Sequence, residues 1–74
     1  MLLKRSFSLA GHRTSIALEA PFWAALEAVA TARGTTLVRL VAAVDSARLP
    51  DDSLASRLRV LALQESAEKN LQPR

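Results

Sequence analysis

Few residues of this chain have the types and spacing that chemistry requires. His12 is the only histidine, there is no cysteine, and no paired carboxylates or glycine-rich phosphate loop are present. Acid–base and nucleophilic catalysis need such groups in partnered sets, and metal sites need clusters of them. We therefore expect no enzyme activity, no catalytic residue, no metal, no cofactor and no small-molecule substrate.

The chemistry that remains is that of basic side chains near the start of the chain. Lys4, Arg5 and Arg13, with His12 beside them, all precede the first acidic residue, Glu19, and the net charge of the whole chain is +3. Small basic proteins are common, so the total charge is a modest signal, but its concentration fits a nucleic-acid partner.

These basic residues lie on segments whose side chains alternate in type. Residues 13–18 place arginine, serine and alanine on one side and threonine, isoleucine and leucine on the other, as a strand does. Residues 4–10 alternate as well, and Gly11-His12 between the two runs is typical of a two-residue hairpin turn with glycine first. The alternative is that residues 4–10 form a flexible basic arm.

The predicted turn sets a register in which Phe7 opposes Ile16. One face of the hairpin would then be apolar and the other small and polar. The apolar face would carry Phe7, Leu9, Ile16 and Leu18, and the opposite face Ser6, Ser8, Ser15 and Ala17.

Three helices are predicted to follow the strands. They span about residues 20–33, 36–48 and 53–65, within a single domain of residues 1–65, and residues 66–74 form a frayed tail. Pro21 suits the first turn of the first helix, and Gly34 suits a left-handed stop after it. Thr36 is the expected N-cap of the second helix.

The size of the chain favours an oligomer. It has 74 residues, of which 50% are hydrophobic, and a domain this short buries only about 60% of its unfolded surface. The second helix is apolar around most of its circumference, which is typical of a helix covered on several sides. Phe22 and Leu26 begin the apolar stripe of the first helix, so Trp23 points partly off it and is expected to cover an interface. We expect a dimer or a higher oligomer.

The sequence also bears on location. It has no run of about 18 apolar residues and no apolar core of a secretory signal near its start. With the absence of cysteine, this predicts a cytoplasmic protein with no membrane partner. We find no internal repeat.

The order strand, helix, glycine-containing turn and Thr-capped helix resembles the ribbon-helix-helix family of Arc-like and methionine-repressor-like proteins. Leu18, Phe22 and Leu26 resemble the family's apolar triplet between strand and helix, and Gly34 with Thr36 resembles its turn before the second helix. The core resemblance covers residues 13–48, and the chain is similar to an uncharacterised bacterial branch of the family over about residues 4–63.

The resemblance implies a mainly α fold with a short N-terminal β-ribbon and an extra third helix, assembled as an intertwined homodimer. The paired strands would enter the DNA major groove. The implied contacts are Arg13, Ser15 and Ala17 to bases, and Lys4, Arg5, Thr36 and Arg39 on or near phosphates. The implied dimer interface comprises Ile16, Leu18, Trp23, Leu40, Val41 and Val44. The implied function is a dimeric bacterial transcription regulator. The alternative is a protein-interaction module or antitoxin-like dimer that keeps the fold without strong DNA reading.

An ordered N-terminal hairpin would change how such a protein meets DNA. Two paired strands, about 5 Å apart, fit a major groove about 12 Å wide, whereas two hairpins joined into four strands would span about 14 Å. We expect ordinary groove insertion if residues 4–10 are a mobile arm. If they form an ordered hairpin, we expect another mode of DNA binding or a role in protein contacts.

Overall fold

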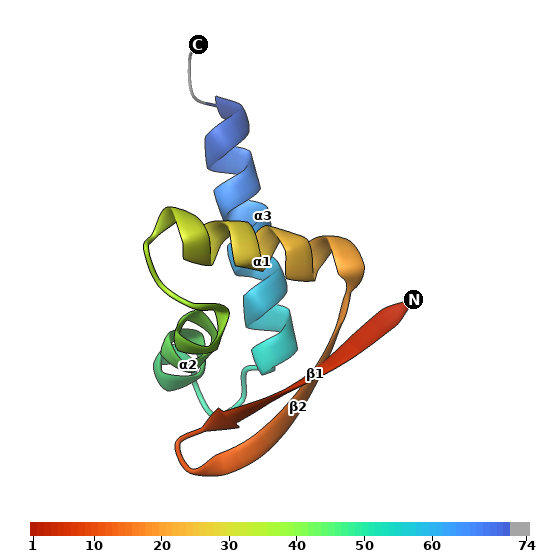
Figure 1. Cartoon of the computed structure of the whole chain (residues 1–74), viewed down its shortest axis with the longest axis vertical. Helices are drawn as coiled ribbons and strands as arrows, with labels where there is room; N and C mark the ends of the chain where they lie inside the picture. The colour runs from red at the N-terminus through yellow and green to blue at the C-terminus, as the bar shows by residue number, and fades with distance from the viewer. Residues whose placement is uncertain (72–74) are drawn as a thin grey trace.

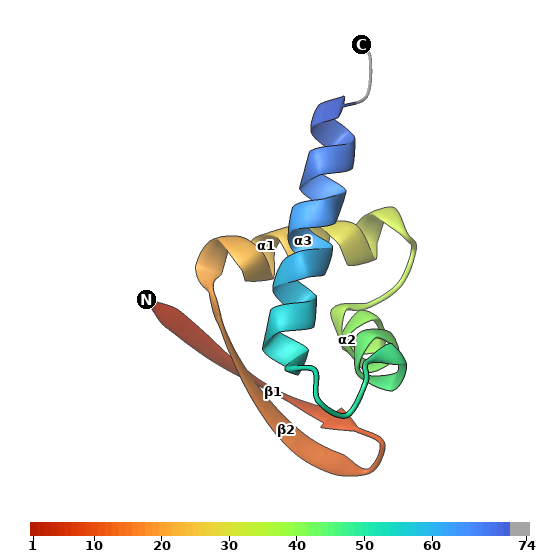
Figure 2. The same ribbon diagram turned by 180° about the vertical axis from the view of Figure 1, so that it is seen from behind.

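The computed structural model contains two strands followed by three helices (Figure 1), and it describes residues 1–71, with side chains for residues 1–65. The elements are β1 (Leu2–Leu9), β2 (His12–Glu19), α1 (Ala20–Ala32), α2 (Leu37–Ala47) and α3 (Leu54–Leu71). The strands form an antiparallel hairpin, and the helices cover one of its faces (Figures 1 and 2). This is the mainly α architecture with an N-terminal β-ribbon and a third helix that the sequence predicts.

The hairpin turn is formed by Ala10 and Gly11, not by Gly11 and His12. Ala10 has φ 51° and Gly11 has φ 82°, and two central residues with positive φ make a type I′ turn, whose twist matches that of the paired strands. Phe7 consequently pairs with Thr14. The register expected from the sequence placed Phe7 opposite a residue two positions further along β2, and that expectation is wrong.

Contacts between β1 and α1 require the observed register. The Trp23 indole Nε1 donates a hydrogen bond of 2.8 Å to the carbonyl oxygen of Leu3, and Nη1 of Arg5 lies 3.1 Å from Oε1 of Glu27. A slip of two residues would move β1 by about 6.6 Å along β2 and break both contacts. A slip of two leaves each side chain on its own face, so the expected apolar face is still the buried one.

Local signals mark the ends of α1 and the start of α2. Pro21 lies in the first turn of α1, and Gly34, with φ 68°, takes the left-handed position after the helix. The Thr36 hydroxyl oxygen accepts a hydrogen bond of 3.1 Å from the backbone amide of Arg39 and caps α2. The connection between the two helices is therefore encoded in the residues that form it.

Helix α3 begins after a serine cap and is longer than expected. The Ser53 hydroxyl accepts a hydrogen bond of 3.3 Å from the amide of Ser56. The helix continues to Leu71, six residues past the expected end at Glu65 and into the segment for which a frayed tail was expected. Residues 72–74 of that segment lie outside the described residues.

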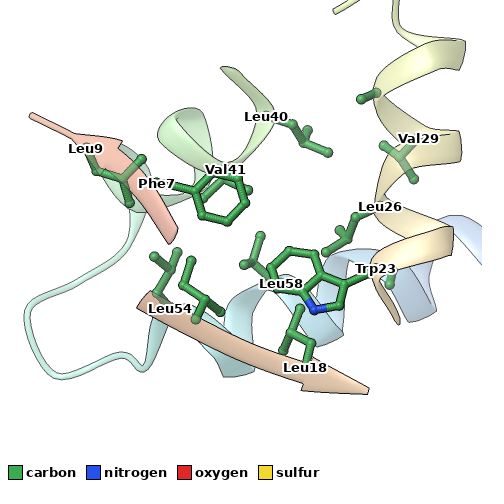
Figure 3. Close-up of a cluster of buried hydrophobic side chains, with 13 residues drawn as sticks. Phe7, Leu9, Leu18, Trp23, Leu26, Val29, Leu40, Val41, Leu54 and Leu58 are labelled. Carbon is green, nitrogen blue, oxygen red and sulfur yellow. The ribbon is translucent and has the colours of Figure 1, made fainter. Parts of the chain in front are cut away.

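One hydrophobic core joins all five elements. Its buried residues are Phe7, Leu9, Ile16, Leu18, Trp23, Leu26, Val29, Ala30, Leu40, Val41, Leu54, Leu58 and Ala62. Side chains from the hairpin, α1, α2 and α3 converge on this core in Figure 3. Helix α3 packs against α1, α2 and β2, and its first turns lie next to the hairpin (Figures 1 and 2).

Trp23 lies in this core and not on its margin. It is 2% exposed, and its ring centroid is 5.8 Å from that of Phe7. The buried stripe of α1 starts at Trp23 and continues through Leu26 and Ala30, whereas Phe22 is half-buried. The expectation that Trp23 points off the stripe is wrong because the stripe begins one residue later than Phe22.

Candidate nucleic-acid interface

The outward face of the hairpin is small, polar and basic. Its three central cross-strand pairs are Lys4 with Ala17, Ser6 with Ser15, and Ser8 with Arg13. The hydroxyl oxygens of Ser6 and Ser15 are 3.1 Å apart at the centre of the face. Serine can donate or accept hydrogen bonds, and lysine and arginine can bind phosphates or guanine acceptors. The face thus carries groups that suit a nucleic-acid surface.

The two positive charges of this face are not neutralised within the described part of the chain. Lys4 and Arg13 are both exposed, and neither takes part in any of the ion pairs found among the described residues. The six side chains of the three central pairs include no acid. Unpaired surface charge of one sign attracts a polyanion at long range.

Arg5 is placed differently from Lys4, although both were expected near phosphates. It points to the inner side of β1, where its guanidinium carbon lies 5.1 Å from the centroid of the Trp23 ring. Its Nη1 also lies 3.1 Å from Oε1 of Glu27. The cation–π contact and the ion pair together tie Arg5 to α1. Arg5 therefore contributes to the fold and does not share the outward face.

A second arginine, Arg59, contacts the junction between β2 and α1. Arg59 of α3 places Nη2 3.1 Å from Oε1 of Glu19, and its guanidinium carbon is 5.8 Å from the Phe22 ring centroid. A hydrogen bond from its own backbone amide lowers the pKa of Glu19 from the usual 4.5; desolvation opposes this shift, and Arg59 lowers the pKa further. Arg59 thus pairs with a residue that is 40 positions away in the sequence.

The other expected phosphate contacts lie at the start of α2, a helix that lies nearer the turn end of the hairpin than its open end (Figures 1 and 2). The Thr36 side chain is occupied by the amide of Arg39, and the Arg39 side chain is exposed. The first-turn amides of Leu37 and Val38 have no carbonyl partner in helical geometry, so they can meet an anion. Thr36 and Arg39 are thus on a separate element from the outward hairpin face.

The residues expected at a dimer interface lie mostly in the core of the single chain. Ile16, Leu18, Trp23, Leu40 and Val41 are each 4% exposed or less, and Val44 is half-buried. The large apolar side chains that the helices and their loops expose are instead Val38, Leu49, Val60 and Leu63. In this conformation a second copy has to contact residues other than the five buried ones.

The described part of the chain shows neither a metal site nor a membrane span. No group of three or more metal-binding side chains gathers there. None of its helices has the length and hydrophobicity needed to cross a bilayer.

A two-stranded ribbon with a polar outer face, backed by helices, defines the class of small β-ribbon proteins with a helical core. The family model for the ribbon-helix-helix domain matches residues 2–66. The chain therefore belongs to the ribbon-helix-helix family, whose members typically dimerise and are in general DNA-binding transcription regulators or antitoxins, not enzymes. No curated protein and no solved structure shows a significant match to it.

Proposed function

We propose that this chain binds double-stranded DNA through the outward face of its hairpin and acts as a transcription regulator. The observation that carries the proposal is a two-stranded ribbon whose outward charges, Lys4 and Arg13, have no ion-pair partner among the described residues. Two strands about 5 Å apart fit a major groove about 12 Å wide. An ordered hairpin from one chain is therefore narrow enough to enter the groove. The expectation of another binding mode for an ordered hairpin applies only where two hairpins join into four strands.

The side chains of the face differ in what they can recognise. Arg13 can make a bidentate contact to O6 and N7 of guanine, a pairing worth about 1–3 kcal/mol of discrimination. Ser15 can donate or accept, and Ala17 can offer only a methyl contact to thymine. Thr36 and Arg39 are proposed to position phosphates. Because so few long side chains reach the bases, we expect phosphate contacts to supply most of the affinity.

The test is binding to random-sequence duplex DNA over a salt series. Affinity is expected to fall steeply with salt, and Arg13→Ala should weaken binding. If Arg13 contacts a phosphate, the slope of log K against log salt should be less steep by about 0.9 in the Arg13→Ala variant. Arg57→Ala is the matched control, because it removes the same charge from the groove between α2 and α3. Absence of binding at low salt, or equal weakening by both variants, would contradict the proposal.

A second candidate function, protein–protein interaction, is favoured by the apolar side chains of α3. Val60 is 39% exposed and Leu63 is 60% exposed. Val60 also lines a groove with Val44 and Leu61 that is rimmed by two arginines. We propose a second copy of this chain as the occupant, because the family typically dimerises and this surface lies on the helices, where contact leaves the hairpin free.

This surface can be tested without DNA. Leu63→Asp is expected to shift the protein from dimer to monomer in sedimentation equilibrium, because it places a charge in the contact. The same mass for the variant and the unaltered chain would exclude α3 as the dimer surface.

A further inference from the structure

β1 and β2 carry the same pattern of side chains, nine residues apart. The outward residues Lys4, Ser6 and Ser8 correspond to Arg13, Ser15 and Ala17, and the inward Phe7 and Leu9 correspond to Ile16 and Leu18. This short repeat is missed in a reading of the sequence because only the serine and leucine positions, Ser6 with Ser15 and Leu9 with Leu18, are identical.

Strand pairing turns the repeat into approximate symmetry. In an antiparallel pair, a twofold axis through the centre of the Ser6–Ser15 pair exchanges residues equally far along each strand. The exchanged outward pairs are Ser6 with Ser15, Lys4 with Arg13, and Ser8 with Ala17. The basic residues Lys4 and Arg13 therefore occupy two diagonal corners of the face, and the small residues Ser8 and Ala17 occupy the other two. The axis passes between Ser6 and Ser15, whose hydroxyl oxygens are 3.1 Å apart.

In a two-chain ribbon, the strand related by such an axis comes from a partner. We propose that in this protein β1 takes that strand's place, so that a single chain carries a complete DNA-reading ribbon. The inference rests on the proposed DNA binding and extends it. Lys4, Ser6 and Ser8 of β1 contact the duplex in the same way as the corresponding residues of β2. The ligand is a short duplex site with approximate inverted-repeat symmetry.

The core supports this assignment independently of the outward face. Leu18 and Val41 are 0% exposed, and Ile16 and Leu40 are 4% exposed, in the single chain. These are residues that a partner would cover in an intertwined dimer, and here β1 and α3 complete the core around them. The single chain thus needs no second strand to bury the inner face of its ribbon.

The geometry gives the spacing of the two strongest contacts. Lys4 and Arg13 are diagonal on the face, four residues apart along the strands and one strand apart across them. That places their Cα atoms about 14 Å apart, or roughly four base pairs along the duplex. Lysine and arginine both favour guanine. We therefore expect selected sites to carry guanines on opposite strands with roughly this separation.

The first arm of the test needs no DNA. Because the chain has no cysteine, the Ser6→Cys/Ser15→Cys double variant contains only the two introduced thiols, at directly paired positions. Oxidation is expected to give a monomer with an internal disulfide on non-reducing gels. Ser15→Cys alone should cross-link chains no more than Ser56→Cys, an exposed position on α3. Preferential disulfide dimers of the Ser15→Cys variant would show two β2 strands paired with each other and would overturn the inference.

The second arm uses duplexes selected by the unaltered protein from a random-sequence library. Lys4→Ala and Arg13→Ala are each expected to weaken binding by about fivefold or more, while Arg57→Ala has a smaller effect. Native mass spectrometry of the Leu63→Asp variant, in which the proposed α3 contact between chains is disrupted, should show one chain on a duplex containing a single site. Normal binding by Lys4→Ala, or an obligatory pair of Leu63→Asp chains on one site, would overturn the single-chain ribbon alone. No binding by the unaltered chain would instead reject the proposed function.

Discussion

The turn residue Ala10 allows a direct test of the hairpin register on which the outward face depends. Its φ of 51° lies in the left-handed region, which costs a residue with a β-carbon about 1–2 kcal/mol. Asparagine tolerates this conformation, and Asn-Gly is a favoured pair for a type I′ turn. We expect Ala10→Asn to raise the free energy of unfolding by about 1 kcal/mol, because it relieves about half of that strain. In a domain of this size the gain corresponds to about 4–8 °C in Tm, measurable by circular dichroism.

His12→Asn is the matched control for this substitution. In the observed register His12 is a paired strand residue, where asparagine is disfavoured, so this variant should be less stable than the unaltered chain. If Gly11 and His12 formed the turn instead, the two effects would exchange, because Ala10 would then be a strand residue. A lower Tm for Ala10→Asn together with a higher Tm for His12→Asn would refute the observed turn.

Three further predictions concern the core and the junction between β2 and α1. Leu58→Ala, at a fully buried position, should cost about 2–5 kcal/mol in urea unfolding, whereas Leu63→Ala, 60% exposed, should cost about 0.5 kcal/mol or less. Trp23→Phe removes the donor to the carbonyl oxygen of Leu3 and should lower the free energy of unfolding by about 1–3 kcal/mol; an unchanged Tm would show that this hydrogen bond contributes nothing. The lowered pKa of Glu19 means that its stabilising effect is present above the unfolded-state pKa and is lost as the pH falls through the folded-state pKa. Glu19→Gln should therefore flatten the loss of stability below about pH 4.5, and identical acid titrations of stability would contradict this.

The parts of the fold that local chemistry determines were predictable from the sequence. Gly34 ends α1 and Thr36 caps α2 because one supplies a left-handed backbone and the other a hydroxyl acceptor. Alternation also placed Arg5 with Phe7 on the inner face, since a strand puts every second side chain on the same side. The prediction that Arg5 lies on or near phosphates rested on its charge alone.

The features that escaped prediction depend on residues far apart in the chain. The hairpin register depends on the hydrogen bond between Trp23 and Leu3, and the role of Arg59 depends on Glu19. Neither contact leaves a signal in a window of neighbouring residues. The symmetry of the ribbon was not predicted for another reason. β1 and β2 carry side chains of similar chemical character at most corresponding positions, but the same residue at only two of them.

The ordered hairpin makes DNA binding and association through its strand edges mutually exclusive. The hairpin has two strands of eight residues, and an unpaired edge of that length is a template for pairing with another chain. If two copies joined at such an edge, the four strands would span about 14 Å between outer backbones, more than a major groove about 12 Å wide admits. A copy docked on α3 would leave the hairpin narrow enough for the groove. The surface that joins two chains therefore decides whether the ribbon can reach bases.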